Sequence, residues 1–121
     1  KIFQFGIRSG SREEISWGKK HVHTSFFNFD QLDNLVNSLK EQPVYLTIDL
    51  DVLDSSVFPG TGTPEAGGVS FCQLLDAIKK VSNLNIVALD ITELAPPLDP
   101  TGASTALACK LLREILLYVY K

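Results

Sequence analysis

Two aspartates separated by one residue, Asp49 and Asp51, lie at the end of a mainly apolar run from Val44 to Leu50. We predict that this run is a buried strand of a parallel sheet, because such strands are almost continuously apolar. Side chains two residues apart on a strand face the same side, so both carboxylates should project together, with Cα atoms about 6.5–7 Å apart. Carboxylates this close repel each other unless a divalent cation neutralises them. Purely oxygen ligands favour Mg²⁺, Ca²⁺ or Mn²⁺.

The same pair also has an interpretation without a metal, in which one aspartate caps a turn and the other is solvated. A long loop follows, Asp54 to Val69, with four of the eight glycines of the chain. Loops after parallel strands are where α/β proteins place ligand-binding residues. Within it we expect Asp54 to accept hydrogen bonds from loop backbone as an Asx-turn residue.

The elements that must position these residues follow from apolar periodicity and capping signals. Ser11 and Ser70 each begin a capping box, and Asp30 is a predicted N-cap. The order of strands and helices predicts an α/β fold with a parallel sheet and helices on both faces. The expected strands are 2–7, 44–50 and 86–89, with a further short strand within 21–29, and the expected helices are 12–18, 32–39, 71–81 and a largely buried 103–120.

Composition excludes several classes of protein. The 121 residues carry a formal net charge of -3, whereas nucleic-acid binding usually needs a basic face. No apolar run approaches the roughly 18 residues of a membrane-spanning helix. Cys72 and Cys109 lack zinc-ligand spacing, and we predict buried, reduced thiols and a cytoplasmic location. Because Lys1 opens the chain inside an alternating apolar run, we expect that the protein has further sequence before Lys1.

Two longer motifs around these residues resemble the signature of the ureohydrolase family, which includes arginases and agmatinases. The resemblance covers nearly the whole chain and is greatest to the agmatinases. One departure is Ser55, where the family usually has proline. The motifs are Asp49-Leu50-Asp51-Val52-Leu53-Asp54, continuing through Phe58-Pro59-Gly60-Thr61-Gly62-Thr63-Pro64-Glu65 to Gly67-Gly68, and Leu89-Asp90-Ile91-Thr92-Glu93-Leu94-Ala95-Pro96-Pro97-Leu98-Asp99.

The resemblance implies a three-layer α/β/α fold with a mainly parallel sheet, of which residues 1–121 are the carboxyl-terminal part of a single domain. It assigns Asp49 and Asp51 as ligands of Mn²⁺, two ions per complete active site, with the other ligands in motifs absent here. It assigns Glu93 to the guanidinium group of the substrate and Thr63 to a nearby position. Asp90 is expected to be structural, or to support a ligand, and no catalytic residue is assigned in this chain.

The implied activity is hydrolysis of a guanidinium C–N bond, with agmatine giving putrescine and urea. The expected partners are a small cationic guanidino substrate and further copies of the protein, as a trimer or hexamer, without nucleic acid or membrane. Arginase, formiminoglutamase and guanidinobutyrase activities remain alternatives.

Two alternatives lie outside this activity. A haloacid-dehalogenase-like phosphatase also has D-x-D after an apolar strand, but its second aspartate is usually followed by Gly and Thr, not by Val52-Leu53. The second alternative is a non-catalytic structural fragment, because most metal ligands are missing. His21 and His23 match no family motif and are not assigned as ligands.

Overall fold

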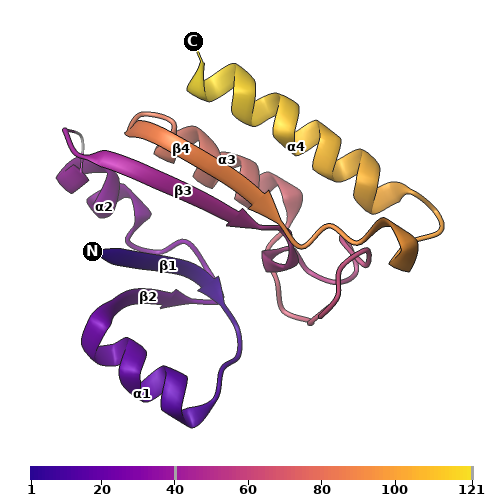
Figure 1. Cartoon of the computed structure of the whole chain (residues 1–121), viewed down its shortest axis with the longest axis horizontal. Helices are drawn as coiled ribbons and strands as arrows, with labels where there is room; N and C mark the ends of the chain where they lie inside the picture. The colour runs from indigo at the N-terminus through magenta and orange to yellow at the C-terminus, as the bar shows by residue number, and fades with distance from the viewer. Residues whose placement is uncertain (40, 121) are drawn as a thin grey trace.

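A computed structural model describes residues 1–39 and 41–120, which form alternating strands and helices (Figure 1). The strands and α-helices are β1 (Ile2–Ile7), α1 (Arg12–His21), β2 (Val22–Phe26), α2 (Leu32–Leu39), β3 (Pro43–Asp49), α3 (Phe71–Val81), β4 (Asn85–Thr92) and α4 (Ala103–Val119). A short 3-10 helix, η1 (Leu50–Val52), follows β3, and a second, η2 (Pro96–Leu98), precedes α4. The strand expected within 21–29 is present as β2.

Both strand pairs are parallel, β1 with β2 and β3 with β4, so the predicted α/β class with a parallel sheet is confirmed. Within the described residues the pairing is divided between two two-stranded sheets. The two units make contact near the end of β1 and just beyond the end of β3, where a Cβ built on Gly6 would lie 2.4 Å from Val52 Cγ2. A glycine is therefore needed at this approach, and its φ of +75° is also one that suits glycine.

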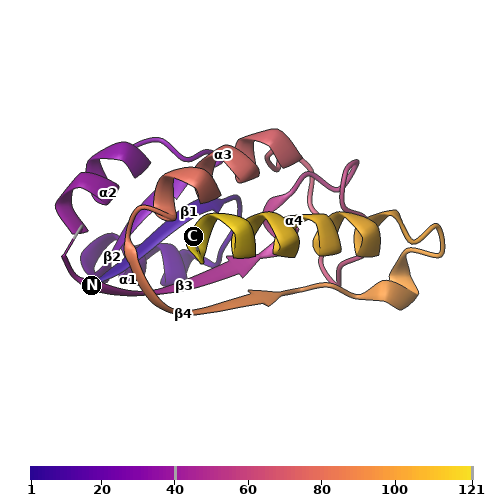
Figure 2. The same ribbon diagram turned by 90° about the horizontal axis from the view of Figure 1, so that it is seen from above.

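The main hydrophobic core lies between the β3–β4 sheet and two helices, α3 and α4. Figure 2 shows α2, α3 and α4 on one side of this sheet. Residues on the opposite side of the sheet, such as Tyr45 and Val87, are exposed. The described residues thus make up part of a layered domain, with one helical layer over β3–β4. The buried core residues are Ile48, Leu50, Leu53, Phe58, Val69, Leu74, Ile78, Ala108, Leu111 and Ile115.

Helix α4 was expected to be largely buried, and that prediction is wrong for the described residues. Leu111 and Ile115 are fully buried against the core, whereas Leu112, Leu116 and Leu117 remain exposed. One face of α4 packs on the domain, and nothing among the described residues covers the other. None of the described helices is long and apolar enough to cross a membrane.

The capping signals were mostly correct. Ser11 and Ser70 both form the predicted capping boxes, with Glu14 and Gln73. The prediction for Asp30 is wrong: α2 begins at Leu32, and Asp30 instead exchanges hydrogen bonds with the Asn28 side chain at 2.8 and 3.0 Å.

The prediction of buried thiols is also wrong. Cys72 on α3 and Cys109 on α4 are both free and exposed. The buried residues of these two helices lie at other positions, Leu74, Ala77 and Ile78 on α3 and Ala108 and Leu111 on α4. Both cysteines therefore occupy the faces of α3 and α4 that are turned away from the core.

Candidate metal and substrate site

The two aspartates of the D-x-D motif are brought together by a turn. Strand β3 ends at Asp49, and Asp51 lies in η1. The position of Asp51 therefore does not result from the strand alternation that we predicted. The Asp49 side chain accepts a hydrogen bond from the Asp51 backbone N–H at 3.1 Å and caps this turn. Leu50 and Leu53, with 0% and 1% exposure, hold the turn in the core. The turn-capping interpretation is thus correct for Asp49, and the two carboxylates still lie together.

The electrostatics of this pair favour a cation. Burial raises the pKa of Asp49 above its ordinary value, and the neighbouring Asp51 and Glu93 carboxylates raise it further. The backbone N–H of Asp51 acts in the opposite direction. Among the described residues, none of the salt bridges involves these three carboxylates. Their negative charge is therefore concentrated and not balanced within residues 1–39 and 41–120.

Glu93 lies at the same sheet edge. The parallel register pairs Asp49 with Thr92, so the next residue emerges beside the aspartates. Glu93 has a φ of +68°, a left-handed backbone conformation that costs a non-glycine residue about 1–3 kcal/mol and is concentrated at functional sites. Its Oε2 lies 3.9 Å from a Cβ built on Gly62, so the carboxylate faces the glycine-rich loop.

Thr63 joins this group from the loop. Its hydroxyl donates to Asp51 Oδ2 at 3.3 Å, which folds the loop over the end of β3. The structure therefore brings together all four residues that the sequence indicated for metal and substrate, Asp49, Asp51, Thr63 and Glu93.

Asp54 fixes the two ends of the loop to each other. It accepts hydrogen bonds from the backbone N–H groups of Ser56, Gly67 and Gly68 at 3.0, 2.7 and 3.1 Å. These bonds and one from the Ser56 hydroxyl, the largest cause, lower its pKa to about 2. The Asx-turn prediction is confirmed. A Cβ at Gly68 would lie 2.4 Å from the Asp54 backbone nitrogen, so only glycine fits there.

Arg8 is a residue that the sequence analysis missed. Its side chain is 5% exposed, and it donates to the carbonyl oxygens of Asp51 at 2.5 Å and Val52 at 3.1 Å. Its Nε lies 3.9 Å from a carboxylate oxygen of Glu65. Arg8 thereby holds the backbone of the turn that carries Asp51. Its place directly after β1 indicated a position at the sheet edge, but not its contact with a carbonyl oxygen 44 residues away.

Asp90 and the two histidines lie in ordinary structural contacts. Asp90 accepts hydrogen bonds across the sheet from the hydroxyls of Tyr45 and Thr47, the latter at 2.6 Å. His23 stacks on Phe3 at 4.8 Å and His21 on Trp17 at 4.5 Å between ring centroids. These contacts support the structural role expected for Asp90.

The donor set fits part of a Mn²⁺ site. Asp49 and Asp51 offer the hard carboxylate oxygens that Mn²⁺ accepts. Within the described ranges, however, no three His, Cys, Asp or Glu side chains come together in a way that could hold a metal ion. Two aspartates are too few for a tightly bound pair of ions, so a complete site would need further ligands from outside the described residues.

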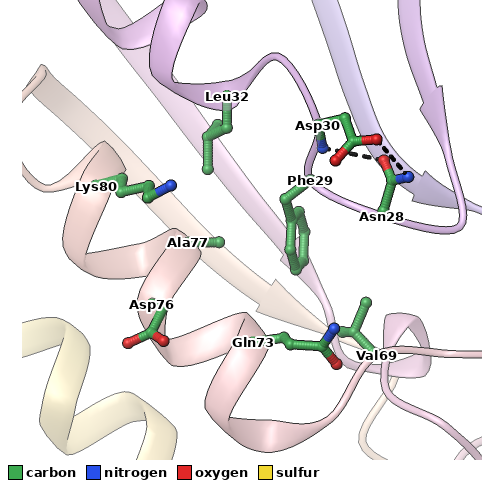
Figure 3. Close-up of a pocket in the computed structure, with 9 residues that line it drawn as sticks. All are labelled: Asn28, Phe29, Asp30, Leu32, Val69, Gln73, Asp76, Ala77 and Lys80. Carbon is green, nitrogen blue, oxygen red and sulfur yellow. Dashed lines mark hydrogen bonds between the residues drawn. The ribbon is translucent and has the colours of Figure 1, made fainter.

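A separate hollow of about 280 Å³ lies between α3 and the segment before α2 (Figure 3). Figure 3 shows the Phe29 side chain directed toward Val69 and Gln73, with Lys80, Ala77 and Asp76 on the helix beside it. None of the four predicted site residues lines this hollow. It is therefore distinct from the candidate site.

Comparisons with known proteins give a consistent answer. A sequence profile of the arginase family matches residues 1–118. An agmatinase from Bacillus anthracis is 45% identical over 121 residues, covering 96% of this chain and 41% of the relative. A solved Clostridium difficile structure is 52% identical with a TM-score of 0.93, covering 98% of this chain and 45% of the other. The arginase from Bacillus caldovelox is 25% identical with a TM-score of 0.84, covering 94% and 42%. This chain thus spans less than half the length of these proteins.

Proposed function

The chain belongs to the arginase family of hydrolases, and from this premise we propose that it is the carboxyl-terminal part of a manganese-dependent agmatinase. The complete enzyme would hydrolyse agmatine to putrescine and urea. The observation that carries this proposal is the convergence of Asp49, Asp51, Thr63 and Glu93 at one edge of the β3–β4 sheet. The cytoplasmic location and the homo-oligomeric assembly expected from the sequence belong to the same proposal.

Asp49 and Asp51 are the residues that would hold manganese. The concentrated negative charge at the end of β3 supports this role, because a divalent cation lets both carboxylates remain ionised. When bound, a pair of ions would lower the pKa of a shared water so that hydroxide is available near neutral pH. The ligands that complete the site would come from sequence outside these 121 residues.

Glu93 and Thr63 would bind the substrate. A planar guanidinium presents parallel N–H donors, and a carboxylate accepts two of them in a charge-assisted, bidentate contact. The left-handed backbone at Glu93 turns its side chain toward the loop, where Thr63 donates to Asp51. The guanidinium carbon would then be held beside the aspartates that bind the metal.

Agmatine is the substrate best supported. The identity is 45% to an agmatinase and 46% to an N(1)-aminopropylagmatine ureohydrolase, whose named substrate contains the agmatine unit, against 32% to a guanidinobutyrase and 25% to an arginase of known structure. Arginine, formiminoglutamate and guanidinobutyrate remain the alternatives, because they share the guanidinium-like end and differ at the far end of the molecule.

The test is urea release by the complete protein that contains this chain. Urea release from agmatine should be faster than urea release from arginine or guanidinobutyrate and faster than formamide release from formiminoglutamate, and chelation should abolish the activity until Mn²⁺ is restored. The 121-residue chain alone, as a control, should be silent, because it holds only two of the proposed ligands. Activity that persists without manganese, or hydrolysis of phosphate esters through an acyl-phosphate at Asp49, would contradict the proposal.

A further inference from the structure

A buried polar network lies behind the candidate site, at the start of α4. Asp99 and Ser104 are 5% and 0% exposed, although both are polar. The Asp99 carboxylate accepts hydrogen bonds from the Ser104 backbone N–H at 2.8 Å and from the Thr101 N–H and hydroxyl at 3.1 and 2.5 Å. The residue at the N-cap position, Gly102, has no side chain to do this. Asp99 therefore caps α4 from outside the helix and fixes Ser104.

Ser104 connects this cap to the glycine-rich loop. Its hydroxyl oxygen accepts a hydrogen bond from the Gly60 backbone N–H at 2.9 Å, in a buried position. A Cβ on Gly60 would lie 2.7 Å from Ser104 Cβ and 3.0 Å from Asp99 Cβ. The loop backbone thus rests directly on the network, with room only for glycine.

The same residue, Gly60, also holds the segment that carries Glu93. Its carbonyl oxygen accepts a hydrogen bond from the Ala95 N–H at 2.8 Å. Ala95 follows Glu93 by two residues, and Thr63 follows Gly60 by three. The backbone groups of Gly60 therefore connect α4, the loop with Thr63 and the strained turn with Glu93.

We propose that Asp99 and Ser104 are positioning residues, which hold Gly60 so that Thr63 and Glu93 face the same substrate group. This inference rests on the proposed function, because that function assigns Thr63 and Glu93 to the guanidinium group of the substrate. The pKa of Asp99 is lowered to about 2, with the Thr101 hydroxyl as the largest cause, so the carboxylate is charged at neutral pH. None of the hydrogen bonds in this network involves Asp49 or Asp51. Loosening it should affect the handling of substrate more than the binding of metal.

The test compares Ser104→Ala and Asp99→Asn with Ser70→Ala in the complete, manganese-loaded protein. Ser70 caps α3 and bonds only within its own capping box, so its variant loses a helix cap without touching the loop. In Ser104→Ala the Gly60 N–H is left buried and unpaired. We expect kcat/KM for agmatine to fall on the order of tenfold, as for loss of a buried hydrogen bond, with manganese content unchanged. Ser70→Ala should retain kcat/KM.

Hydrogen exchange supplies a readout independent of activity. The Gly60 and Ala95 amides should exchange faster in Ser104→Ala and Asp99→Asn than in Ser70→Ala. If both amides stay protected, or if kcat/KM of both network variants equals that of Ser70→Ala, the positioning role is wrong. If Ser104→Ala does not fold, Asp99→Asn, which keeps the Ser104 hydroxyl, decides the matter by the same two measurements. If the unmodified protein releases urea from no guanidino substrate, the proposed function fails, and amide exchange alone decides whether the network holds Gly60.

Discussion

Asp49, at the end of β3, and Asp99, before α4, have the same side chain in opposite surroundings. The Asp99 carboxylate accepts hydrogen bonds from the backbone and a hydroxyl beside it, and its pKa is lowered to about 2. The carboxylate of Asp54, at the base of the glycine-rich loop, likewise accepts hydrogen bonds that lower its pKa to about 2. The Asp49 carboxylate is partly desolvated and lies beside Asp51 and Glu93, and its pKa is raised. Asp54 and Asp99 therefore have hydrogen-bond donors from their own surroundings, whereas the strand-end region, formed by Asp49, Asp51, Thr63 and Glu93, holds negative charge that no salt bridge among the described residues balances.

The first prediction removes the negative charge from the strand-end region. Asp49→Ala or Asp51→Ala in the complete protein should lose manganese and urea release together, because each removes a ligand and its charge. Metal analysis after desalting is the measurement. Asp76→Ala, at an exposed position on α3, is the matched control and should retain both. If the two site variants keep the manganese content of the unmodified protein, the ligand assignment is wrong.

The second prediction separates substrate from metal within the same region. Glu93→Gln keeps the shape of the side chain but places an amide donor opposite the donors of the guanidinium. Loss of a charged hydrogen bond costs about 1.5–3 kcal/mol, so kcat/KM should fall by at least about tenfold. Manganese content should remain that of the unmodified protein. Loss of metal, or unchanged turnover of guanidino substrates, is the result that would exclude this role.

The residues of the strand-end region could be identified from the sequence, because short motifs carry them. Asp49, Asp51, Thr63 and Glu93 all lie in the two sequence motifs, and the structure brings them together, while their roles toward metal and substrate stay predictions. The local geometry was predicted less well. We predicted that the strand continues through Leu50, whereas Leu50 begins a 3-10 turn. An apolar residue at this position fits either structure, so the sequence did not distinguish them.

The supports of the site could not be identified in the same way. Arg8 contacts a carbonyl oxygen 44 residues away, and Ser104 contacts Gly60 across another 44 residues. Such contacts follow from how elements pack, and periodicity within a single element does not report them. The left-handed backbone at Glu93 is likewise fixed by its surroundings, since glutamate has no preference for that conformation.

The third prediction tests the contrast between Asp49 and Asp99 through the melting temperature of the metal-free complete protein at neutral pH. Asp49→Asn should raise the melting temperature, because it removes a charge that burial and two neighbouring carboxylates disfavour, while its amide oxygen still accepts from Asp51. Asp99→Asn should lower it, because an amide replaces a carboxylate that accepts three hydrogen bonds. Changes of the same sign in both variants would show that the two regions do not differ as described.

The last prediction follows the same two variants with pH. The pKa of Asp99 falls from 3.8 to about 2 on folding, so its stabilising effect is present above pH 4 and is lost as the pH falls toward 2. The deficit in melting temperature of Asp99→Asn should therefore shrink over that interval. The pKa of Asp49 is raised on folding, so its ionised form destabilises the folded protein above that pKa. Acid protonates this carboxyl in the unmodified protein and removes the destabilisation. The gain in melting temperature of Asp49→Asn should therefore also shrink as the pH falls. Calorimetry from pH 7 to 2 should thus show two differences of opposite sign that both converge toward zero. The Asp99 difference should persist to lower pH, because its folded-state pKa lies below the ordinary value and that of Asp49 lies above it. Convergence in the reverse order would contradict the assigned directions of the two pKa shifts.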